Sequence, residues 1–421
     1  MAFRDLLGSA RTISESTSVL HGIFDKSCSL NHQLLLFDNI EEAPGHRVAL
    51  NLLTRNELCK GLSIAPEEFI DLLGSAMGQL GEPKIVENGP VLECPQEVVD
   101  LTKLPIPHHW REDRGRYMSA SMIIAEYGGI RNMSFHRQFL RDQNHLVARI
   151  VPRHLRTMMT AARDNQEEVN IAIINAPDPV VMLSAAMSFD DNLDELLIAS
   201  TLHEKVYNRP LELVTLPNGI QVPADCEYAM WGRITTENDD EGPYVDITGT
   251  VDDVRQEPVI EVDGITHRKD PIFHALIPAQ AEHKALMGLP RAPTIKAAVN
   301  EVCECLDVHM TEGGGGWLAA IVKIRPADSD DAHRAIESAL AGHRSMKMVT
   351  IVDEDIDITD PVRVEWAMMT RWQPDRDTVI ISGQKGSSLD PSRDANGLTA
   401  KIGIDATIPF GIDRTPFTSV Q

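Results

Sequence analysis

The pattern of apolar and polar positions separates the first hundred residues from the rest of the chain. Within Ile64–Leu80, apolar residues recur at helical spacing after a Pro-Glu-Glu start, which predicts a helix with acidic residues in its first turn. The stretch Lys103–Trp110 (KLPIPHHW) is punctuated by prolines and is predicted to be a connector. Residues 1–100 are therefore predicted to form an N-terminal α/β segment.

Beyond the connector, the chain consists of short apolar runs with two helical segments between them. The runs predict strands at Tyr117–Tyr127, Leu146–Val151, Ile171–Ile174, Leu211–Leu216, Met230–Ile234 and Val245–Val251. The helical segments are Pro152–Ala162, which begins with a proline, and Asn192–Ala199, which follows an Asp-Asp cap. Many short strands with intervening helices favour a barrel-like or split sheet. No GxGxxG motif follows a strand and no GxxxxGK[ST] motif occurs, so a doubly wound nucleotide-binding fold is not expected.

The last part of the chain alternates helices and strands after a break at Leu286–Pro293. The pattern predicts a helix, a four-glycine turn, a strand, a helix and a strand, in that order, at Thr294–Val302, Gly313–Gly316, 317–324 (WLAAIVKI), Ala332–Ala341 and Met348–Val352. We therefore predict an α/β (α+β) protein in three parts. These are the segment 1–100, a split β-barrel domain over residues 101–291 and a C-terminal α/β domain over residues 292–421.

The charge and the cysteines exclude some classes of function. The 421 residues include 63 acidic and 39 basic ones, which gives a formal net charge of −24. This charge repels phosphate backbones and anionic lipid, so binding to nucleic acid or to membranes is not expected. Six scattered cysteines are too few for a disulfide scaffold, and no stretch of about 18 apolar residues predicts a membrane span. We expect a cytoplasmic protein with reduced cysteines.

The first segment with candidate chemistry is Arg131–Gln138 (RNMSFHRQ). If it forms a strand, Asn132, Ser134 and His136 share one face while Arg137 lies on the other. The segment then offers an amide oxygen, a hydroxyl and an imidazole side by side. The alternative is a solvated strand edge without a chemical role.

The second segment is PRHLR, where His154 lies between Arg153 and Arg156 at the start of a predicted helix. A helix N-terminus with guanidinium groups nearby is a natural site for a phosphate. The alternative is a histidine that caps the helix or packs against it. Glu195, within DDNLDELL, is open to the same two interpretations: a ligand, or one acid on a solvated helix face.

The third segment is EGPYVDITG, in which Glu241 and Asp246 flank a Gly-Pro turn. Such a turn can fold two carboxyl groups toward a common cleft. Two neighbouring carboxylates raise the pKa of one of them, which makes a proton donor available near neutral pH. The alternative is a solvent-facing turn whose acids serve solubility.

The order and spacing of the three segments resemble the UbiD family, decarboxylases that use prenylated FMN. The resemblance rests on Asn132 with Arg137 five residues on, His154, Glu195 after an Ala-Ala-Met element, and the EGPxxD stretch. RPLELV, VPAD and KIGIDAT, at 209–214, 222–225 and 401–407, also look like family segments. Together these cover most of the chain from about Pro105 onward.

The resemblance implies a flavin-binding central domain with a metal-bridged cofactor phosphate. The implied ligands of the divalent ion, Mn²⁺ or Mg²⁺, are Asn132, His154 and Glu195. A bound K⁺ is implied as well, held by backbone oxygens near Ala185 and Met187 and by the Glu195 carboxylate. Other implied contacts to the flavin or its phosphate are Ser134, Arg153, Ala185, Ala186, Met187 and Lys347.

The resemblance also implies a catalytic trio of Arg137, Glu241 and Asp246. Arg137 is expected to anchor the carboxylate of an α,β-unsaturated acid as a bidentate partner, Glu241 to hold Arg137, and Asp246 to donate the proton after CO₂ leaves. A flavin prenyltransferase is the implied supplier of the cofactor. Family precedent implies a homodimer or a trimer of dimers, assembled through the C-terminal domain.

The length of the chain is similar to that of a compact archaeal branch, which includes decarboxylases of anhydromevalonate phosphate. That branch implies conversion of trans-anhydromevalonate 5-phosphate to isopentenyl phosphate, as part of an archaeal mevalonate pathway. His136, Arg153 and Arg156 are the cations expected to be available to a phosphorylated substrate. The alternatives are a decarboxylase of 4-hydroxybenzoate-type or polyprenyl-hydroxybenzoate acids, an FMN-binding oxidoreductase and a catalytically silent binding protein.

Overall fold

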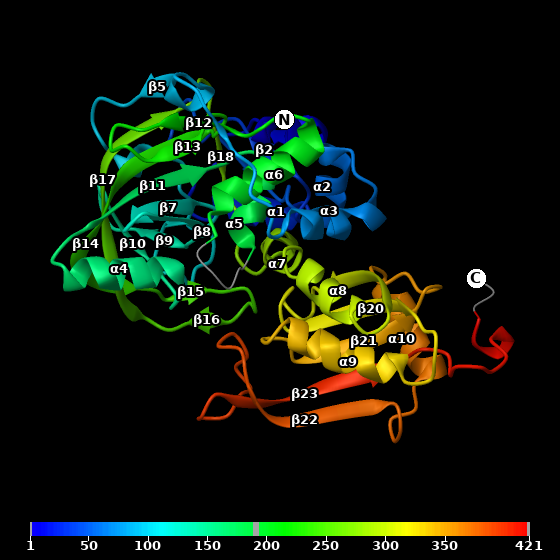
Figure 1. The fold of residues 1–421 in the computed structure, drawn as a ribbon. Helices are drawn as coiled ribbons and strands as arrows, with labels where there is room; N and C mark the ends of the chain where they lie inside the picture. The colour runs from blue at the N-terminus through cyan, green and yellow to red at the C-terminus, as the bar shows by residue number, and fades with distance from the viewer. Residues whose placement is uncertain (1, 188–192, 419–421) are drawn as a thin grey trace. The chain divides into compact units, whose positions relative to one another are not determined.

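The computed structural model describes residues 2–187 and 193–418 (Figure 1). The chain divides into two compact units, one of Met1–Ile64 with Ala76–His283 and one of Ala65–Ser75 with Lys284–Gln421. Helices and strands are mixed in both units, as expected for the α/β (α+β) class. The division into three domains remains a prediction.

A nine-stranded sheet organises the first unit. Eight of its strands follow the order β6-β9-β10-β17-β14-β11-β7-β8. The ninth, β5, pairs antiparallel with the C-terminal end of β17. The bounds are β5 Cys94–Pro95, β6 Tyr117–Met118, β7 Met122–Tyr127, β8 Ile130–Phe135, β9 Gln138–Leu140, β10 His145–Ala148, β11 Val169–Asn175, β14 Tyr228–Glu241 and β17 Arg255–His267. The two longest strands, β14 and β17, pair antiparallel with a register shift at Trp231/Gly232. A Cβ on Gly232 would lie 2.0 Å from the Glu261 carbonyl oxygen, so this close approach requires glycine.

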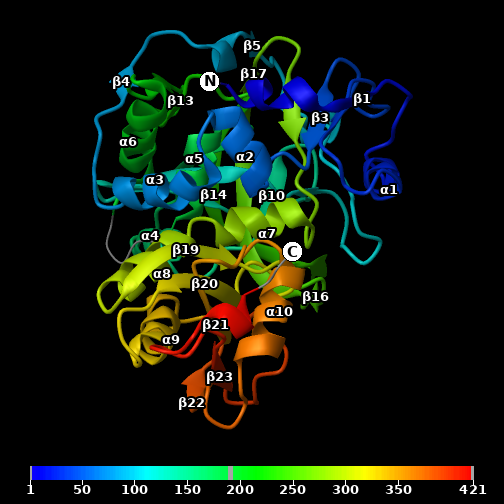
Figure 2. The ribbon, with the colours of Figure 1, turned by 90° about the vertical axis from the view of Figure 1, so that its right-hand side faces the viewer.

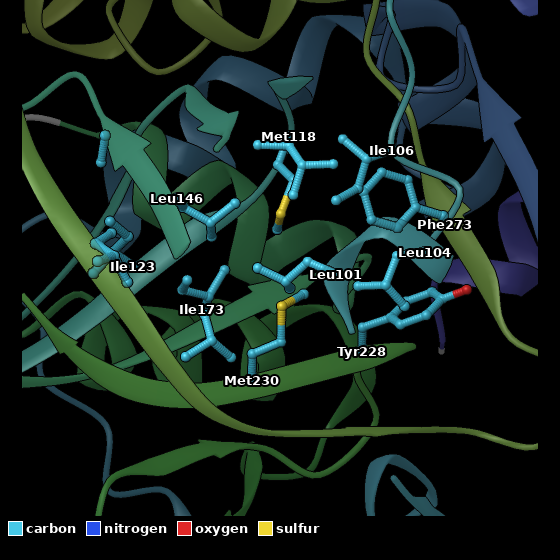
Figure 3. Packing of buried hydrophobic residues seen from close by; sticks show 14 of the residues in the cluster. Leu101, Leu104, Ile106, Met118, Ile123, Leu146, Ile173, Tyr228, Met230 and Phe273 are labelled. Carbon is cyan, nitrogen blue, oxygen red and sulfur yellow. The ribbon is translucent and has the colours of Figure 1, made fainter. Parts of the chain in front are cut away.

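The core of the first unit lies against this sheet. Ile123, Leu146, Ile173 and Met230 come from four of its strands and pack together, as Figure 3 shows. The predicted connector Lys103–Trp110 contains no helix or strand after residue 103, which confirms that prediction. Its residues Leu104 and Ile106 are nevertheless fully buried and complete the same core (Figure 3).

Three helices of the first unit adjoin the sheet strands that carry the candidate residues. They are α4 (His154–Asp164), α5 (Pro179–Ala186) and α6 (Glu195–Tyr207). The helix predicted at 192–199 begins at Glu195, because Asp194 is its N-cap and accepts a hydrogen bond from the Leu196 N–H at 2.9 Å. It also continues beyond the predicted end, to Tyr207. The Asp-Asp pair predicted to cap this helix lies outside the described residues.

Smaller elements complete the first unit. Two further sheets have the orders β1-β2-β3-β18 and β13-β12-β4, and β15 pairs with β16. These elements are β1 Arg11–Ile13, β2 Leu35–Phe37, β3 Arg47–Leu50, β4 Lys84–Ile85, β12 Glu212–Thr215, β13 Gln221–Pro223, β15 Tyr244–Val245, β16 Val251–Asp252, β18 Ile272–His274, α1 Gly22–Ser29 and α2 Arg55–Leu62. The strand predicted at Val245–Val251 is therefore wrong: Gly249, with φ +76°, turns the chain and makes a hairpin.

The second unit is built on a five-stranded sheet of order β19-β20-β21-β23-β22. Figure 2 shows α9 on one side of this sheet and α10 on the other. The elements are α3 Phe69–Ala76, α8 Ala292–Asn300, β19 Glu304–Met310, β20 Ala319–Arg325, α9 Asp331–Gly342, β21 Met348–Asp353, α10 Pro361–Arg371, β22 Thr378–Lys385 and β23 Leu398–Asp405. The boundary between the units lies within α7 Ala281–Gly288, after His283, and Ala76 at the end of α3 belongs to the first unit.

Two predictions on this part of the chain need correction. The helix predicted at Ile64–Leu80 is shorter and begins as a 3-10 turn at Pro66–Glu68 before α3. The break predicted at Leu286–Pro293 is confined to residues 289–291, because α7 continues to Gly288 and α8 begins at Ala292. Within the described ranges, no helix combines the length and the apolar character needed to cross a bilayer.

Candidate active site

The Arg131–Gln138 segment forms a strand only up to Phe135, and β9 starts again at Gln138. The predicted row on one face is present, because Ser134 Oγ lies 3.1 Å from Asn132 Oδ1 and 2.9 Å from His136 Nε2. Arg137 belongs to the short break between β8 and β9. The end of β8 therefore presents Asn132, Ser134 and His136 in one row. The Arg137 guanidinium does not join this row and binds a separate group of carboxylates.

Asn132 and Glu195 meet at the buried end of this row. Asn132 Nδ2 donates to Glu195 Oε1 at 2.9 Å, and the Met133 N–H donates to Glu195 Oε2 at 2.8 Å. Burial raises the pKa of Glu195 to about 7, although the Met133 hydrogen bond acts in the opposite direction. A carboxylate that is costly to bury, next to an amide oxygen, is a donor set that suits a hard divalent cation.

Arg137 lies at the centre of a group of three carboxylates. Its Nε and one terminal nitrogen donate to the two oxygens of Glu241, both at 2.8 Å. The other terminal nitrogen donates to Asp246 at 2.8 Å, and Asp252 accepts a further bond at 2.9 Å. The guanidinium carbon also lies 4.5 Å from the centre of the Tyr244 ring. Burial lowers the pKa of Arg137, but hydrogen bonding to Glu241 and the charges of Glu241 and Asp246 outweigh it and raise the pKa overall.

The hairpin β15–β16 explains how the acids converge on Arg137. Glu241 ends β14, and the turn that follows β15 is closed by the Asp246 N–H, which donates to the Thr250 carbonyl at 3.0 Å. Tyr244 pairs with Asp252 across the hairpin. Sequence analysis missed Asp252 and Tyr244; the glycine at 249 was the available signal for a turn that returns Asp252 to the same place.

Asp113 is a third residue that the sequence patterns did not predict. Its Oδ1 accepts the Val245 N–H at 2.7 Å, while the Arg114 N–H donates to the Pro243 carbonyl at 2.9 Å and the Tyr117 hydroxyl accepts the Gly242 N–H at 3.1 Å. Burial raises the pKa of Asp113 to about 7, against the opposing effects of the Val245 hydrogen bond and the Arg137 charge. The segment after the connector thus fastens the loop that carries the acids.

Asp113→Asn is expected to flatten the pH dependence of stability. The folded protein holds the Asp113 proton more tightly than the unfolded chain, so the free energy of unfolding falls as the pH rises from the usual carboxyl pKa of 3.8 to about 7. For this residue alone the loss between about pH 5 and about pH 7 is about 2 kcal/mol, and asparagine removes it while it keeps an acceptor for Val245.

Urea unfolding of the flavin-free protein across this pH range measures the effect. The exposed residue Glu87, changed to Gln, is the control and is expected to leave the profile unchanged. Parallel profiles for wild type and Asp113→Asn would contradict the prediction.

The remaining candidate ligands lie near helix ends. His154 is the first residue of α4; it is half-buried, and its side chain makes no hydrogen bond or ion pair with another described residue. Arg153 is the exposed N-cap of the same helix. Ala185 and Ala186 end α5, and Met187 is its C-cap. No hydrogen bond joins these side chains to the Asn132–Glu195 pair among the residues that the structure describes, so their part in a cofactor site remains a prediction.

Lys347 belongs to the second unit, whereas every other candidate belongs to the first. Its Nζ donates to Asp390 Oδ2 at 3.0 Å and to Ser392 Oγ at 2.5 Å. Its contact with the cofactor also remains a prediction. Across residues 2–187 and 193–418, no group of three or more His, Cys, Asp or Glu side chains is placed to hold a metal ion; the predicted set differs, because one ligand is an asparagine.

One of the three cations expected for a phosphorylated substrate, His136, needs correction. Burial lowers the pKa of His136 to about 4, so its ring is neutral at neutral pH. Arg156 forms an ion pair with Glu257 and donates to the Ile150 carbonyl, and its contact with a substrate phosphate remains a prediction. Glu257, about a hundred residues away in sequence, also binds Arg149. Arg153 is the exposed cation of the three.

Comparison with known proteins identifies the class of protein that this fold and these residues define. The model of the 3-octaprenyl-4-hydroxybenzoate carboxy-lyase Rift-related domain matches residues 84–281, and that of the C-terminal domain of the same family matches residues 284–406. The chain therefore belongs to the UbiD family, which confirms the resemblance.

Full-length relatives agree with this assignment. The chain is 40% identical to an anhydromevalonate phosphate decarboxylase of Methanosarcina mazei over 97% of this chain and 96% of that protein. It is 38% identical to the protein of the same name from Methanocaldococcus jannaschii, over 93% and 94% of the two chains. The solved UbiD-class enzyme HmfF from Pelotomaculum thermopropionicum, in complex with FMN, matches with a TM-score of 0.94 at 31% identity, over 100% of this chain and 97% of that one. These matches confirm the predicted fold class.

Proposed function

We propose that this protein is a carboxy-lyase that uses prenylated FMN to decarboxylate an α,β-unsaturated acid, trans-anhydromevalonate 5-phosphate, to isopentenyl phosphate. One observation carries the proposal: a single strand end holds Asn132 bonded to Glu195 and, five residues on, Arg137 bonded to Glu241 and Asp246. A cation site and a carboxylate site are then neighbours in one segment. The relatives named as anhydromevalonate phosphate decarboxylases support the choice of acid.

The residues present fit the proposed cofactor and metal. Asn132 and Glu195 would supply oxygen ligands and His154 a nitrogen ligand to Mn²⁺ or Mg²⁺, and a cation would offset the cost of burying the Glu195 charge. Backbone oxygens near Ala185 and Met187 would hold K⁺. Prenylated FMN, when bound, supplies the electron sink for decarboxylation. The HmfF structure with prFMN, 30% identical to this chain, supports the cofactor.

Arg137 would bind the substrate carboxylate. A guanidinium has five N–H groups, and four of those on Arg137 donate to described carboxylates, two of them to Glu241. Glu241 is fully buried and holds the guanidinium in place. The remaining N–H and the one now bonded to Asp246 lie on the same nitrogen, so an incoming carboxylate would bind this nitrogen beside Asp246. The bidentate partner of Arg137 is thus Glu241, and the substrate takes a single terminal nitrogen.

Asp246 would donate the proton to carbon. Its side chain is 25% exposed, whereas Glu241 is 0% exposed, so Asp246 is the acid that substrate can reach. Beside the carboxylate bound on Arg137, Asp246 would be the acid placed to give a proton to the substrate, as a general acid requires.

The assembly and location of the protein follow as part of the proposal. A flavin prenyltransferase would supply the cofactor, and the protein would work in the cytoplasm. Copies would assemble as a homodimer or a trimer of dimers through the C-terminal domain, where Ile380 on the edge strand β22 is 66% exposed. An evolved dimeric form of HmfF is among the similar structures.

Decarboxylation assays of the holoenzyme test the proposed substrate. Protein co-expressed with a flavin prenyltransferase is assayed with anhydromevalonate phosphate, with 4-hydroxybenzoate and with a cinnamate-like acid. We expect kcat/KM to be at least about 100-fold higher for the phosphorylated acid, since a phosphate held by charged groups contributes about 3 kcal/mol or more. Preference for an aromatic acid would overturn the substrate, and NAD(P)H oxidation without CO₂ release would overturn the reaction class.

A further inference from the structure

The hydrogen atoms around His136 can be assigned from its partners. His136 Nδ1 lies 3.0 Å from the backbone carbonyl oxygen of Arg149, which can only accept. Nδ1 therefore carries the hydrogen. Because burial lowers the pKa of His136, the ring is neutral and its other nitrogen, Nε2, is an acceptor.

The Ser134 hydroxyl has one hydrogen and two neighbours that could accept it. His136 Nε2 lies 2.9 Å from Ser134 Oγ, and Asn132 Oδ1 lies 3.1 Å away. The ring nitrogen has no other described donor, so the hydroxyl hydrogen goes to His136. Asn132 cannot turn its amide to meet Ser134 with N–H groups, since its Nδ2 donates to the Glu195 carboxylate at 2.9 Å. Two oxygens, Asn132 Oδ1 and Ser134 Oγ, then face each other with lone pairs only.

Such a pair of oxygens is stabilised by a cation and destabilised without one. If position 136 offered no acceptor, the Ser134 hydrogen would instead bond to Asn132 Oδ1 and compete with a metal for that oxygen. We propose that His136 is a positioning residue that draws the Ser134 hydroxyl hydrogen away from Asn132 Oδ1 and so keeps this oxygen free to bind a divalent cation. The inference rests on the metal site of the proposed function and adds a residue that does not itself touch the metal.

Metal binding to the flavin-free protein tests this role without turnover. Free Mn²⁺ is measured by electron paramagnetic resonance during titration of wild type, His136→Leu, Ser134→Ala and the double variant. His136→Leu is expected to weaken Mn²⁺ binding by about tenfold, the lower end of the effect of residues that orient metal ligands. In the Ser134→Ala background the same change is expected to have no further effect, because no hydroxyl hydrogen remains. His136→Gln keeps an acceptor and is expected to bind Mn²⁺ as wild type does.

These four proteins form a double-mutant cycle, which separates the positioning effect of His136 on Ser134 from any effect of His136 on packing. Equal weakening by His136→Leu in both serine and alanine backgrounds would overturn the inference, as would weakening by His136→Gln to the same extent as by Leu, or no weakening at all. Decarboxylation by the wild-type holoenzyme is measured in parallel. An active wild type with any of these outcomes would reject the role of His136 alone, whereas a wild type that binds no Mn²⁺ and releases no CO₂ would reject the proposed function with it.

Discussion

The Asp246→Asn holoenzyme is expected to keep its flavin and its fold while kcat falls by about 10³-fold. Asparagine has the same shape, and its single side-chain oxygen can still accept the hydrogen bond from Arg137, so the guanidinium stays in place. Only the bond that Asp246 Oδ1 accepts from the Ile247 N–H is given up. It cannot give up a proton, and a positioned general acid contributes about 10² to 10⁴ in rate. Steady-state CO₂ release together with the flavin absorption spectrum measures both parts of the prediction.

Asp253→Asn is the matched control for this variant. Asp253 lies on the same hairpin but is exposed, and its side chain has no ion pair with Arg137. We expect it to turn over as wild type does. Wild-type turnover by Asp246→Asn would remove Asp246 as the proton donor, and loss of flavin from this variant would show instead that Asp246 holds the site together.

His154→Ala is expected to lose the cofactor. The imidazole is the third proposed metal ligand beside Asn132 and Glu195, and its removal leaves the metal with two protein ligands. Metal affinity should then fall by at least about 100-fold, since even groups that only orient a ligand contribute about 10-fold to 100-fold. The ratio of flavin to protein after gel filtration, with metal content from the same sample, measures this loss.

His145→Ala provides the comparison. His145 is also half-buried in the first unit, but it pairs with Asp142 and has no role in the proposed site. It is expected to retain flavin and metal. Full flavin and metal content in His154→Ala would contradict the assignment of His154 as a ligand, and Glu195 with Asn132 would then need another partner.

The local pattern of apolar and polar residues was sufficient to predict the position and type of most helices and strands. Short apolar runs predicted β7, β10, β11 and β12, and the proline start of PRHLR predicted α4, because these signals lie within a few residues. The ends of the strands were predicted less accurately. A strand was predicted at Met230–Ile234, but β14 continues from Tyr228 to Glu241 through polar residues, because pairing with β17 decides its length. The hairpin after Tyr244 was not predicted either, because strand pairing between β15 and β16 forms it.

The candidate site was predictable only where neighbours in sequence are neighbours in space. The row of Asn132, Ser134 and His136 follows from strand alternation, and the structure shows it. Asp113 could not be found in this way, because it reaches the site through a hydrogen bond to the distant Val245. Asp252 reaches it through the hairpin turn at Gly249, which strand alternation does not predict. Likewise, nothing near Arg156 in the sequence shows that it forms an ion pair with Glu257.

Native mass spectrometry of the protein co-expressed with a flavin prenyltransferase tests the central claim most directly. The account predicts a bound flavin heavier than FMN by the prenyl group, together with one divalent metal ion, and predicts the loss of both in His154→Ala. Bound FMN of unmodified mass despite an active prenyltransferase, or a protein with no flavin and no metal, would contradict it.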